Sequence, residues 1–218
     1  MSGARPRIAI VDYGMGNRRS VEKALAHVGA EAAITRDHAE LRAADALVLP
    51  GVGAFPTGMA NLLRHGLVAL LHERAAEGTP ILGICLGMQL LFDASTELGG
   101  AAGMGLIAGE VRRIEAGGRR VPHIGWNEVR LERDSPLTDE LPAAGAPFYH
   151  VHSFVAHPRD RNDVVGTAEY GERFTTIVAH GSVYGTQFHP EKSSRDGLTL
   201  LARFMRLVQS AKPGAVYA

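Results

Sequence analysis

Short apolar runs alternate with amphipathic stretches through the first ninety residues of the chain. Buried strands are predicted at residues 7–14, 31–36, 46–51 and 79–85. The segments between them have apolar side chains at helical spacing and predict helices at 17–29 and 38–44 and one long helix at 58–78. Strands and helices that alternate in this way form right-handed crossovers, so we expect a parallel sheet with helices on both faces.

From about Met104 the pattern changes to strand-like runs separated by Gly, Pro, Asn and Asp. These runs lie at 105–116, 119–131, 147–158, 163–171, 174–181 and 182–190. No helical pattern separates them, and the next helix is predicted at 195–210. We therefore expect a mixed or antiparallel extension of the sheet, within one α/β domain that covers residues 1–218.

The charge balance and the cysteine count narrow the class of protein. Lys and Arg (23 residues) balance Asp and Glu (23 residues), and the arginines are scattered, so no net field attracts nucleic acid or an anionic membrane. The single cysteine cannot form an internal disulfide, and the first apolar run, of about five residues, is too short for a signal peptide or a membrane span. We expect a cytoplasmic protein that binds neither nucleic acid nor membrane.

The single cysteine, Cys85, lies in the sequence GICLGMQ, where a predicted strand meets a helical pattern. A strand, Gly-x-Cys-x-Gly and a helix form the cysteine version of a nucleophile elbow, a sharp turn that points its central side chain out of the sheet. The helix N-terminus would favour the thiolate, and the N–H of Leu86 would face a tetrahedral oxyanion. The alternative is a cysteine buried as a small hydrophobe, so the assignment needs partner residues.

The sequence QFHPEKS offers a base and a group that orients it. His189 and Glu191 are two residues apart at the end of a strand-like run, and in an extended chain their side chains point the same way. The carboxylate would then hold the imidazole in the tautomer that serves the thiol. Taken alone, the segment could equally be a surface turn.

A second oxyanion donor is expected from a loop that follows a neighbouring strand. The sequence PGVG at residues 50–53 follows the predicted strand at 46–49, and its glycines let a peptide N–H turn toward a ligand. The N–H of Val52 or Gly53 is the candidate donor. A plain turn would have the same local sequence.

Together and in this order, PGVG, GICLGMQ and FHPEKS resemble the motifs of the class I glutamine amidotransferases. The resemblance implies a flavodoxin-like three-layer fold and hydrolysis of L-glutamine to glutamate and ammonia, with no cofactor or metal. The triad that it implies is Cys85, His189 and Glu191. The oxyanion hole that it implies is formed by Leu86, Val52, Gly53 and Gly51. The substrate-binding residues that it implies are Gln89, Ser153 and Phe154.

Four longer stretches, VDYGMGNRRSV, LPGVGAFPTGM, VPHIGWNEV and YHVHSFVAHP, resemble the glutaminase subunits of imidazole glycerol phosphate synthases. Arg18 departs from this pattern, where leucine is more usual. The resemblance implies a role in histidine biosynthesis and a heterodimer with a (β/α)₈ cyclase, which receives the ammonia and makes imidazole glycerol phosphate and AICAR. We expect docking at residues 14–17 and 122–127, where Trp126 is either an interface anchor or a core residue.

Other interpretations keep parts of this pattern. His150 and His152 are spaced like metal ligands on one strand face, but no further ligand follows at a recognised spacing, so we expect no metal. The glutaminase of anthranilate or aminodeoxychorismate synthase would retain the triad, although these proteins resemble GVCLGHQ more than GICLGMQ and lack PHIGWN. A redox-sensing or chaperone module would retain the reactive thiol and would need neither His189 nor Glu191.

Overall fold

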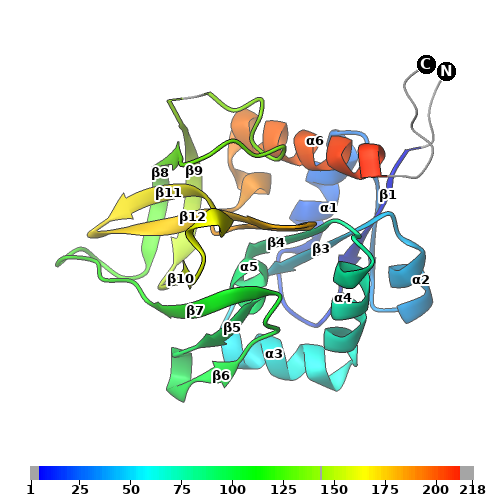
Figure 1. Ribbon diagram of the computed structural model, residues 1–218, viewed down its shortest axis with the longest axis horizontal. Coiled ribbons are helices and arrows are strands. Elements are labelled where there is room, and N and C mark those ends of the chain that lie inside the picture. The colour runs from blue at the N-terminus through cyan, green and yellow to red at the C-terminus, as the bar shows by residue number, and fades with distance from the viewer. Residues whose placement is uncertain (1–4, 143, 212–218) are drawn as a thin grey trace.

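One sheet of 13 strands forms the centre of the computed structural model, which describes residues 5–142 and 144–211 (Figure 1). Along its main path the strands follow the order β2-β1-β3-β4-β13-β12-β10-β7-β5-β6, and β11, β8 and β9 continue outward from β12. The first five strands of this order run parallel, and most of the other pairs are antiparallel. The predicted parallel core with a mixed extension is therefore confirmed.

The parallel part is built from the apolar runs of the first half of the chain and one strand from near its end. Its strands are β1 (Arg7–Val11), β2 (Glu31–Thr35), β3 (Ala46–Gly51), β4 (Ile81–Cys85) and β13 (Val183–Thr186). Every residue of β3 and β4 is buried, as expected for parallel strands that helices cover on both faces. Because β4 lies between β3 and β13, all three strands end at the same edge of the sheet.

The mixed extension contains strands in which buried and exposed side chains alternate. Its strands are β5 (Phe92–Ser95), β6 (Ala101–Ala102), β7 (Ile107–Arg113), β8 (His123–Leu131), β9 (Ala146–His152), β10 (Phe154–Pro158), β11 (Val164–Tyr170) and β12 (Glu172–His180). In β7 and β9 buried positions alternate with more exposed ones, so these strands have one face in the core and one face toward solvent.

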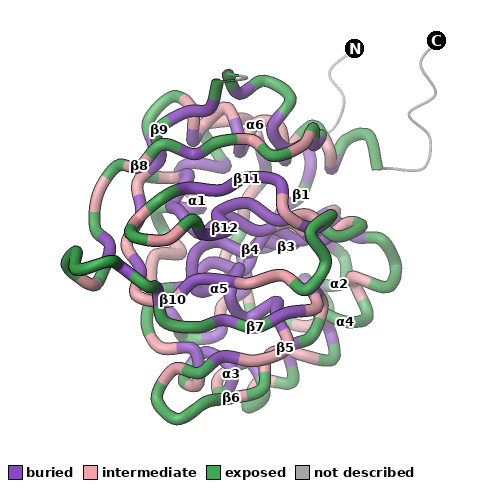
Figure 2. Tube along the Cα trace, turned by 60° about the vertical axis from the view of Figure 1, so that its left-hand side comes forward, coloured by how far each residue is buried: buried purple, intermediate pink, exposed green. Residues whose placement is uncertain are grey.

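Helices cover both faces of the parallel strands (Figure 1). One face packs against α1 (Arg18–His27) and α6 (Ser194–Ala211). The opposite face packs against α2 (His38–Ala43), α3 (Phe55–Arg64), α4 (Leu67–Ala76) and α5 (Leu86–Leu90). The described residues also include three short 3₁₀ helices: η1 (Glu97–Gly99), η2 (Arg161–Asp163) and η3 (Pro190–Lys192). Figure 2 shows that the buried residues concentrate on β1, β3, β4 and α5, at the centre of the molecule.

The prediction of one long helix at 58–78 is wrong. The structure has two helices, α3 and α4, which meet at Gly66, where φ is +65°. This left-handed conformation ends the ladder of helical hydrogen bonds, and glycine adopts it without steric cost. The leucines continue at helical spacing on both sides of the break, so periodicity alone did not reveal it.

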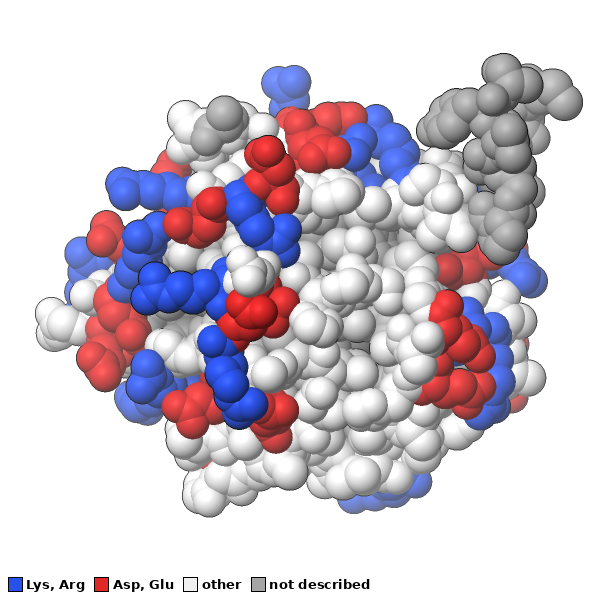
Figure 3. All heavy atoms as spheres, in the orientation of Figure 1, with Lys and Arg blue, Asp and Glu red and all other residues white. Residues whose placement is uncertain are grey.

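Acidic and basic side chains intermingle on the face shown in Figure 3, and neither sign dominates it. This distribution agrees with the equal numbers of the two charges in the sequence. Within the described ranges, no helix combines the length and the apolar character that crossing a membrane requires.

Candidate active site

Cys85 lies at the corner between β4 and α5 with φ +55° and ψ −111°, a conformation that L-residues rarely adopt. Glycine is required on both sides of it. A Cβ atom on Gly87 would lie 1.7 Å from the carbonyl oxygen of Leu49, and one on Gly83 would lie 2.7 Å from the carbonyl oxygen of Gly87. The predicted elbow is therefore present, and its strained corner points the thiol out of the sheet.

His189 connects the thiol to a carboxylate. Its Nδ1 atom lies 2.8 Å from Oε1 of Glu191. Burial alone would lower the pKa of His189, but the interactions of its imidazole with Cys85 and Glu191 raise the pKa to about 10. The environment of His189 thus favours its imidazolium form.

The prediction that extended backbone brings His189 and Glu191 together is wrong, although the two side chains are in contact. Strand β13 ends at Thr186, and the chain then turns, so that Glu191 lies in the 3₁₀ helix η3. A turn, and not extended backbone, brings the carboxylate to the imidazole. Ser193 reinforces this turn, because its hydroxyl donates a 2.7 Å hydrogen bond to the carbonyl of His189.

The PGVG loop (residues 50–53) leaves the sheet beside the thiol. Gly51 is paired with Cys85 in the register of β3 and β4, and Gly53 has a φ of +125°. The buried hydroxyl of Tyr13 donates a 2.7 Å hydrogen bond to the carbonyl of Pro50. Burial, with a smaller contribution from the nearby charge of Cys85, raises the pKa of Tyr13, so this hydroxyl stays protonated and remains a donor.

A pocket of about 240 Å³ opens over the elbow. It is lined by Val52, Gly53, Cys85, Leu86, Gln89, Glu97, Pro122, Val151, His152, Ser153 and Phe154. The thiol lies 3.7 Å from the carbonyl oxygen of Val151 and is almost completely buried. The structure therefore brings Cys85, two residues of the PGVG loop and all three predicted substrate residues to one cavity.

Comparison with known proteins identifies the family. The family model for glutamine amidotransferase class I matches residues 9–207. The chain belongs to the class I glutamine amidotransferases. It is 52% identical to "Imidazole glycerol phosphate synthase subunit HisH" of Moorella thermoacetica over 204 residues, which are 94% of this chain and 96% of the relative. It is 48% identical to the protein of the same name from Symbiobacterium thermophilum, over 93% of this chain and 94% of the relative.

Solved structures support the same fold. A crystal structure described as a glutamine amidotransferase matches with a TM-score of 0.74 at 22% identity, over 93% of this chain and 98% of that chain. The structure of PurLQS from Thermotoga maritima matches with a TM-score of 0.75 at 22% identity, over 94% of this chain and 99% of that chain. At this identity the likeness concerns the fold alone.

In this class I glutamine amidotransferase, Gln89 is oriented by a network that ends at the thiol. Its Nε2 atom donates to the carbonyl of Phe154 (2.9 Å) and to Oε1 of Gln187 (3.0 Å). A backbone carbonyl can only accept, so it fixes the direction of both hydrogen bonds and leaves Nε2 of Gln187 to face Cys85 Sγ, at 3.8 Å. Within the described part of the chain, Oε1 of Gln89 has no partner and remains an acceptor for a ligand in the pocket.

Several residues near the amidotransferase site were not predicted as part of it. They are Tyr13, Asn17, Glu97, His152 and Gln187. Gln187 stands two residues before His189, and that proximity was an available signal. Tyr13 and Glu97 carried none, because the first resembles a core residue and the second a surface charge. Arg18, the departure from the usual pattern, forms an ion pair with Asp12.

The two histidines considered as metal ligands belong to a buried aromatic cluster with His123. Burial lowers the pKa of His123 to about 4 and that of His150 to about 3, and it lowers the pKa of His152 well below its usual value, so all three are neutral at pH 7. Nε2 of His150 lies 2.9 Å from the hydroxyl of Thr176. No group of three or more His, Cys, Asp or Glu residues in the described ranges is arranged to hold a metal ion.

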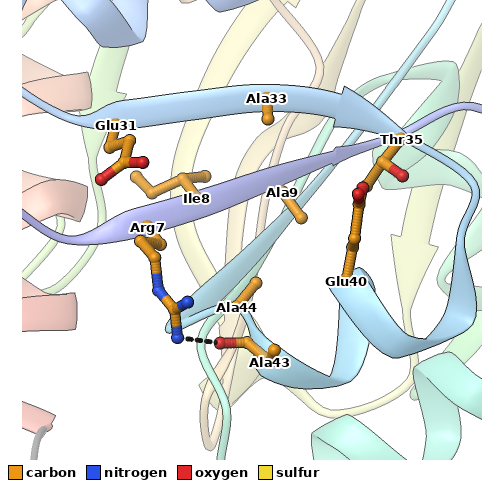
Figure 4. Close-up of a pocket in the computed structure, with 9 residues that line it drawn as sticks. All are labelled: Arg7, Ile8, Ala9, Glu31, Ala33, Thr35, Glu40, Ala43 and Ala44. Atoms are coloured by element: carbon orange, nitrogen blue, oxygen red, sulfur yellow. Dashed lines mark hydrogen bonds between the residues drawn. The ribbon is translucent and has the colours of Figure 1, made fainter.

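A second pocket, of about 300 Å³, lies between β1, β2 and α2 (Figure 4). Alanines form much of its lining, and the guanidinium of Arg7 donates a 2.7 Å hydrogen bond to the carbonyl of Ala43 at its rim. Thr35, Glu31 and Glu40 provide the other polar side chains. The lining of this pocket includes neither a thiol nor an imidazole.

Proposed function

We propose that this chain is the glutaminase subunit of an imidazole glycerol phosphate synthase. The observation that carries the proposal is the strained elbow that places Cys85 in the lining of a pocket of amino-acid size. The 2.8 Å contact of His189 with Glu191 and the influence of Cys85 on the pKa of His189 support it. The names and the identity of the relatives that cover nearly the whole chain support the choice of synthase. The product would be ammonia, used in histidine biosynthesis in the cytoplasm.

The proposed reaction begins at the thiolate–imidazolium pair. Sγ of Cys85 attacks the side-chain carbonyl carbon of glutamine, and the N–H of Leu86 and a donor from the PGVG loop stabilise the oxyanion. His189 gives its proton to the nitrogen as the C–N bond breaks, so ammonia leaves and a thioester remains. The neutral imidazole then takes a proton from water, which attacks the thioester and releases glutamate together with the thiolate.

The polar groups of the pocket fit the remaining part of glutamine. Oε1 of Gln89 is a free acceptor, and the carboxylate of Glu97 lines the same cavity. Both suit the α-ammonium group, which has only donors. Ser153 and Phe154 line the pocket where the strand β9 passes into β10, and we assign their backbone groups to the amino-acid end of the substrate.

We propose that a (β/α)₈ cyclase docks over the mouth of this pocket and receives the ammonia. Three large apolar side chains support a docking face there: Val52 is 40% exposed, Ile124 is 60% exposed and Trp126 is 51% exposed. A half-exposed tryptophan is not a core residue, and interface anchors are enriched in tryptophan. Val52 and Pro122 both line the pocket, so this face includes its rim.

The test is ammonia release from glutamine by the purified chain, with and without the cyclase and its nucleotide substrate. We expect release to require the partner. The variant Cys85→Ala should abolish glutamine hydrolysis and leave synthesis from added ammonia intact in the complex. Glutamine hydrolysis by the Cys85→Ala protein would refute the nucleophile. Activation by a chorismate-using synthase in place of the cyclase would refute the assigned recipient.

A further inference from the structure

Asn17 makes a long-range contact with the triad. Its Nδ2 atom donates a 2.5 Å hydrogen bond to Oε1 of Glu191, a residue 174 positions away in the sequence. The same nitrogen lies 3.3 Å from Nδ1 of His189. Asn17 is therefore in contact with both groups that activate the thiol, although it belongs to the turn between β1 and α1.

The side chain of Asn17 does not cap helix α1. Asn17 occupies the N-cap position, where an asparagine side chain ordinarily accepts a hydrogen bond from the first turn. Within the described residues its side chain makes no such bond, and its backbone is left-handed, with φ +72°. Asparagine tolerates this conformation better than most residues other than glycine. The side chain is turned away from its local role and toward Glu191.

The carboxylate of Glu191 depends on few groups for its orientation. It is fully buried, and its Oε1 atom accepts from both His189 and Asn17. Its Oε2 atom has no hydrogen-bond partner in the described ranges 5–142 and 144–211. Without Asn17, only the imidazole would hold the carboxylate. An amide N–H neither gains nor loses a proton at working pH, so it can hold Oε1 in place whether His189 is charged or neutral.

We propose that Asn17 is a positioning residue of the triad. Its amide fixes Oε1 of Glu191 on Nδ1 of His189, which leaves the other ring nitrogen directed at Cys85. The inference rests on the proposed function, because it assigns Asn17 a role in the same reaction. It predicts that loss of the amide weakens the thiolate–imidazolium pair, without a direct effect on substrate binding, since Asn17 is not among the described residues that line the pocket.

The test uses the fact that Cys85 is the only cysteine in the sequence. The rate of its alkylation by iodoacetamide, measured against pH in the full chain, reports thiolate formation at this site alone. For Asn17→Gly we expect the midpoint to move to higher pH by roughly half to one unit. In the complex, kcat for glutamine hydrolysis should fall about tenfold with little change in KM, as expected for the loss of one charge-assisted hydrogen bond.

Two further variants separate this role from a structural one. Both Asn17→Gly and Asn17→Ala lose the hydrogen bond to Glu191, but glycine suits a φ of +72°, so Asn17→Gly should melt higher than Asn17→Ala while the two lose the same activity. Ser20→Ala, at an exposed position of the same helix, should change neither measurement.

An unchanged alkylation profile in Asn17→Gly would overturn the positioning role, even if activity fell in the complex, because docking alone would then explain the loss. The Cys85→Ala result decides the proposed function separately. A hydrolytically dead Cys85→Ala protein together with a normal Asn17→Gly protein would leave the glutaminase assignment intact and refute only the role of Asn17.

Discussion

Gly51 lies directly opposite Cys85 in the parallel pairing of β3 and β4. The PGVG loop and the nucleophile therefore leave the sheet at the same level, and backbone pairing sets their separation. A Cβ atom on Gly51 would lie 2.1 Å from the hydroxyl oxygen of Tyr13 and 3.2 Å from Cβ of Leu86. The start of the loop is thus enclosed by the phenol on one side and by the first residue after the nucleophile on the other.

The variant Tyr13→Phe tests whether the phenol supports this loop. It removes the donor to the buried carbonyl of Pro50. We expect the free energy of unfolding to fall by about 1–2 kcal/mol, measured by urea denaturation, because a buried hydrogen bond is lost. Glutamine hydrolysis should fall as well, since the loop would hold its oxyanion donor less firmly. An unchanged stability would mean that water replaces the hydroxyl.

The variant Gly87→Ala tests the tight packing of the elbow. Its Cβ atom would meet the carbonyl oxygen of Leu49 at 1.7 Å, and a backbone atom cannot move without disturbing β3. We expect a loss of about 3 kcal/mol or more in the free energy of unfolding, or failure to fold. Gly78→Ala is the control, since a Cβ atom there would meet nothing within 4 Å. Its cost should be about 1 kcal/mol, from the positive φ alone. Equal losses of unfolding free energy in Gly87→Ala and Gly78→Ala would show that the close approach of Gly87 to Leu49 does not limit stability.

The sequence predicted most of the elements because their signals are local. Strand β4, the glycines of the elbow and the helix that follows are encoded in consecutive residues, and so is the alternation that gives the parallel sheet. The break between α3 and α4 could not be seen in the same way. Leucines continue at helical spacing across Gly66, so the pattern of apolar residues does not mark the left-handed glycine at which the two helices meet.

The site residues that could not be predicted from the sequence are held by contacts between distant segments of the chain. Cys85, His189 and Glu191 could be brought together because each lies in a recognisable motif. Asn17 could be predicted only as part of a turn, since its partner lies 174 residues away. The orientation of Gln89 likewise depends on Gln187, from another strand end. Such pairings follow from sheet order and register, which hydrophobic periodicity does not specify.

The buried histidine cluster predicts a loss of stability in acid. The pKa of His150 is lowered to about 3 and that of His123 to about 4, chiefly by burial, whereas both would titrate near 6.5 in the unfolded chain. Below pH 6.5 the unfolded state binds more protons than the folded state, so the free energy of unfolding should fall as the pH decreases from 6.5 toward 4. Each histidine contributes a slope of at most about 1.4 kcal/mol per pH unit.

The variant His150→Gln checks this linkage, because glutamine can still pair with Thr176 but does not titrate. Urea denaturation of the variant at a series of pH values should show a shallower dependence between pH 6.5 and 4 than the parent. His27→Gln, at an exposed position of α1, is the control and should leave the slope unchanged. A parent whose stability is flat over this range would contradict the neutral state of the cluster.

Two variants of Gln187 can separate its effect on the substrate from its effect on the thiol. Gln187→Glu keeps an acceptor for Gln89 but replaces the N–H that faces Cys85 with an anion, so thiolate formation should shift to higher pH and kcat should fall, with KM nearly unchanged. Gln187→Met removes both interactions and leaves one N–H of Gln89 unpaired, so KM should rise in addition. Steady-state kinetics in the complex and the pH profile of Cys85 alkylation measure the two effects independently. If both variants raised KM and left the alkylation profile unchanged, Gln187 would act on Gln89 alone, and its 3.8 Å approach to the sulfur would have no influence on the nucleophile.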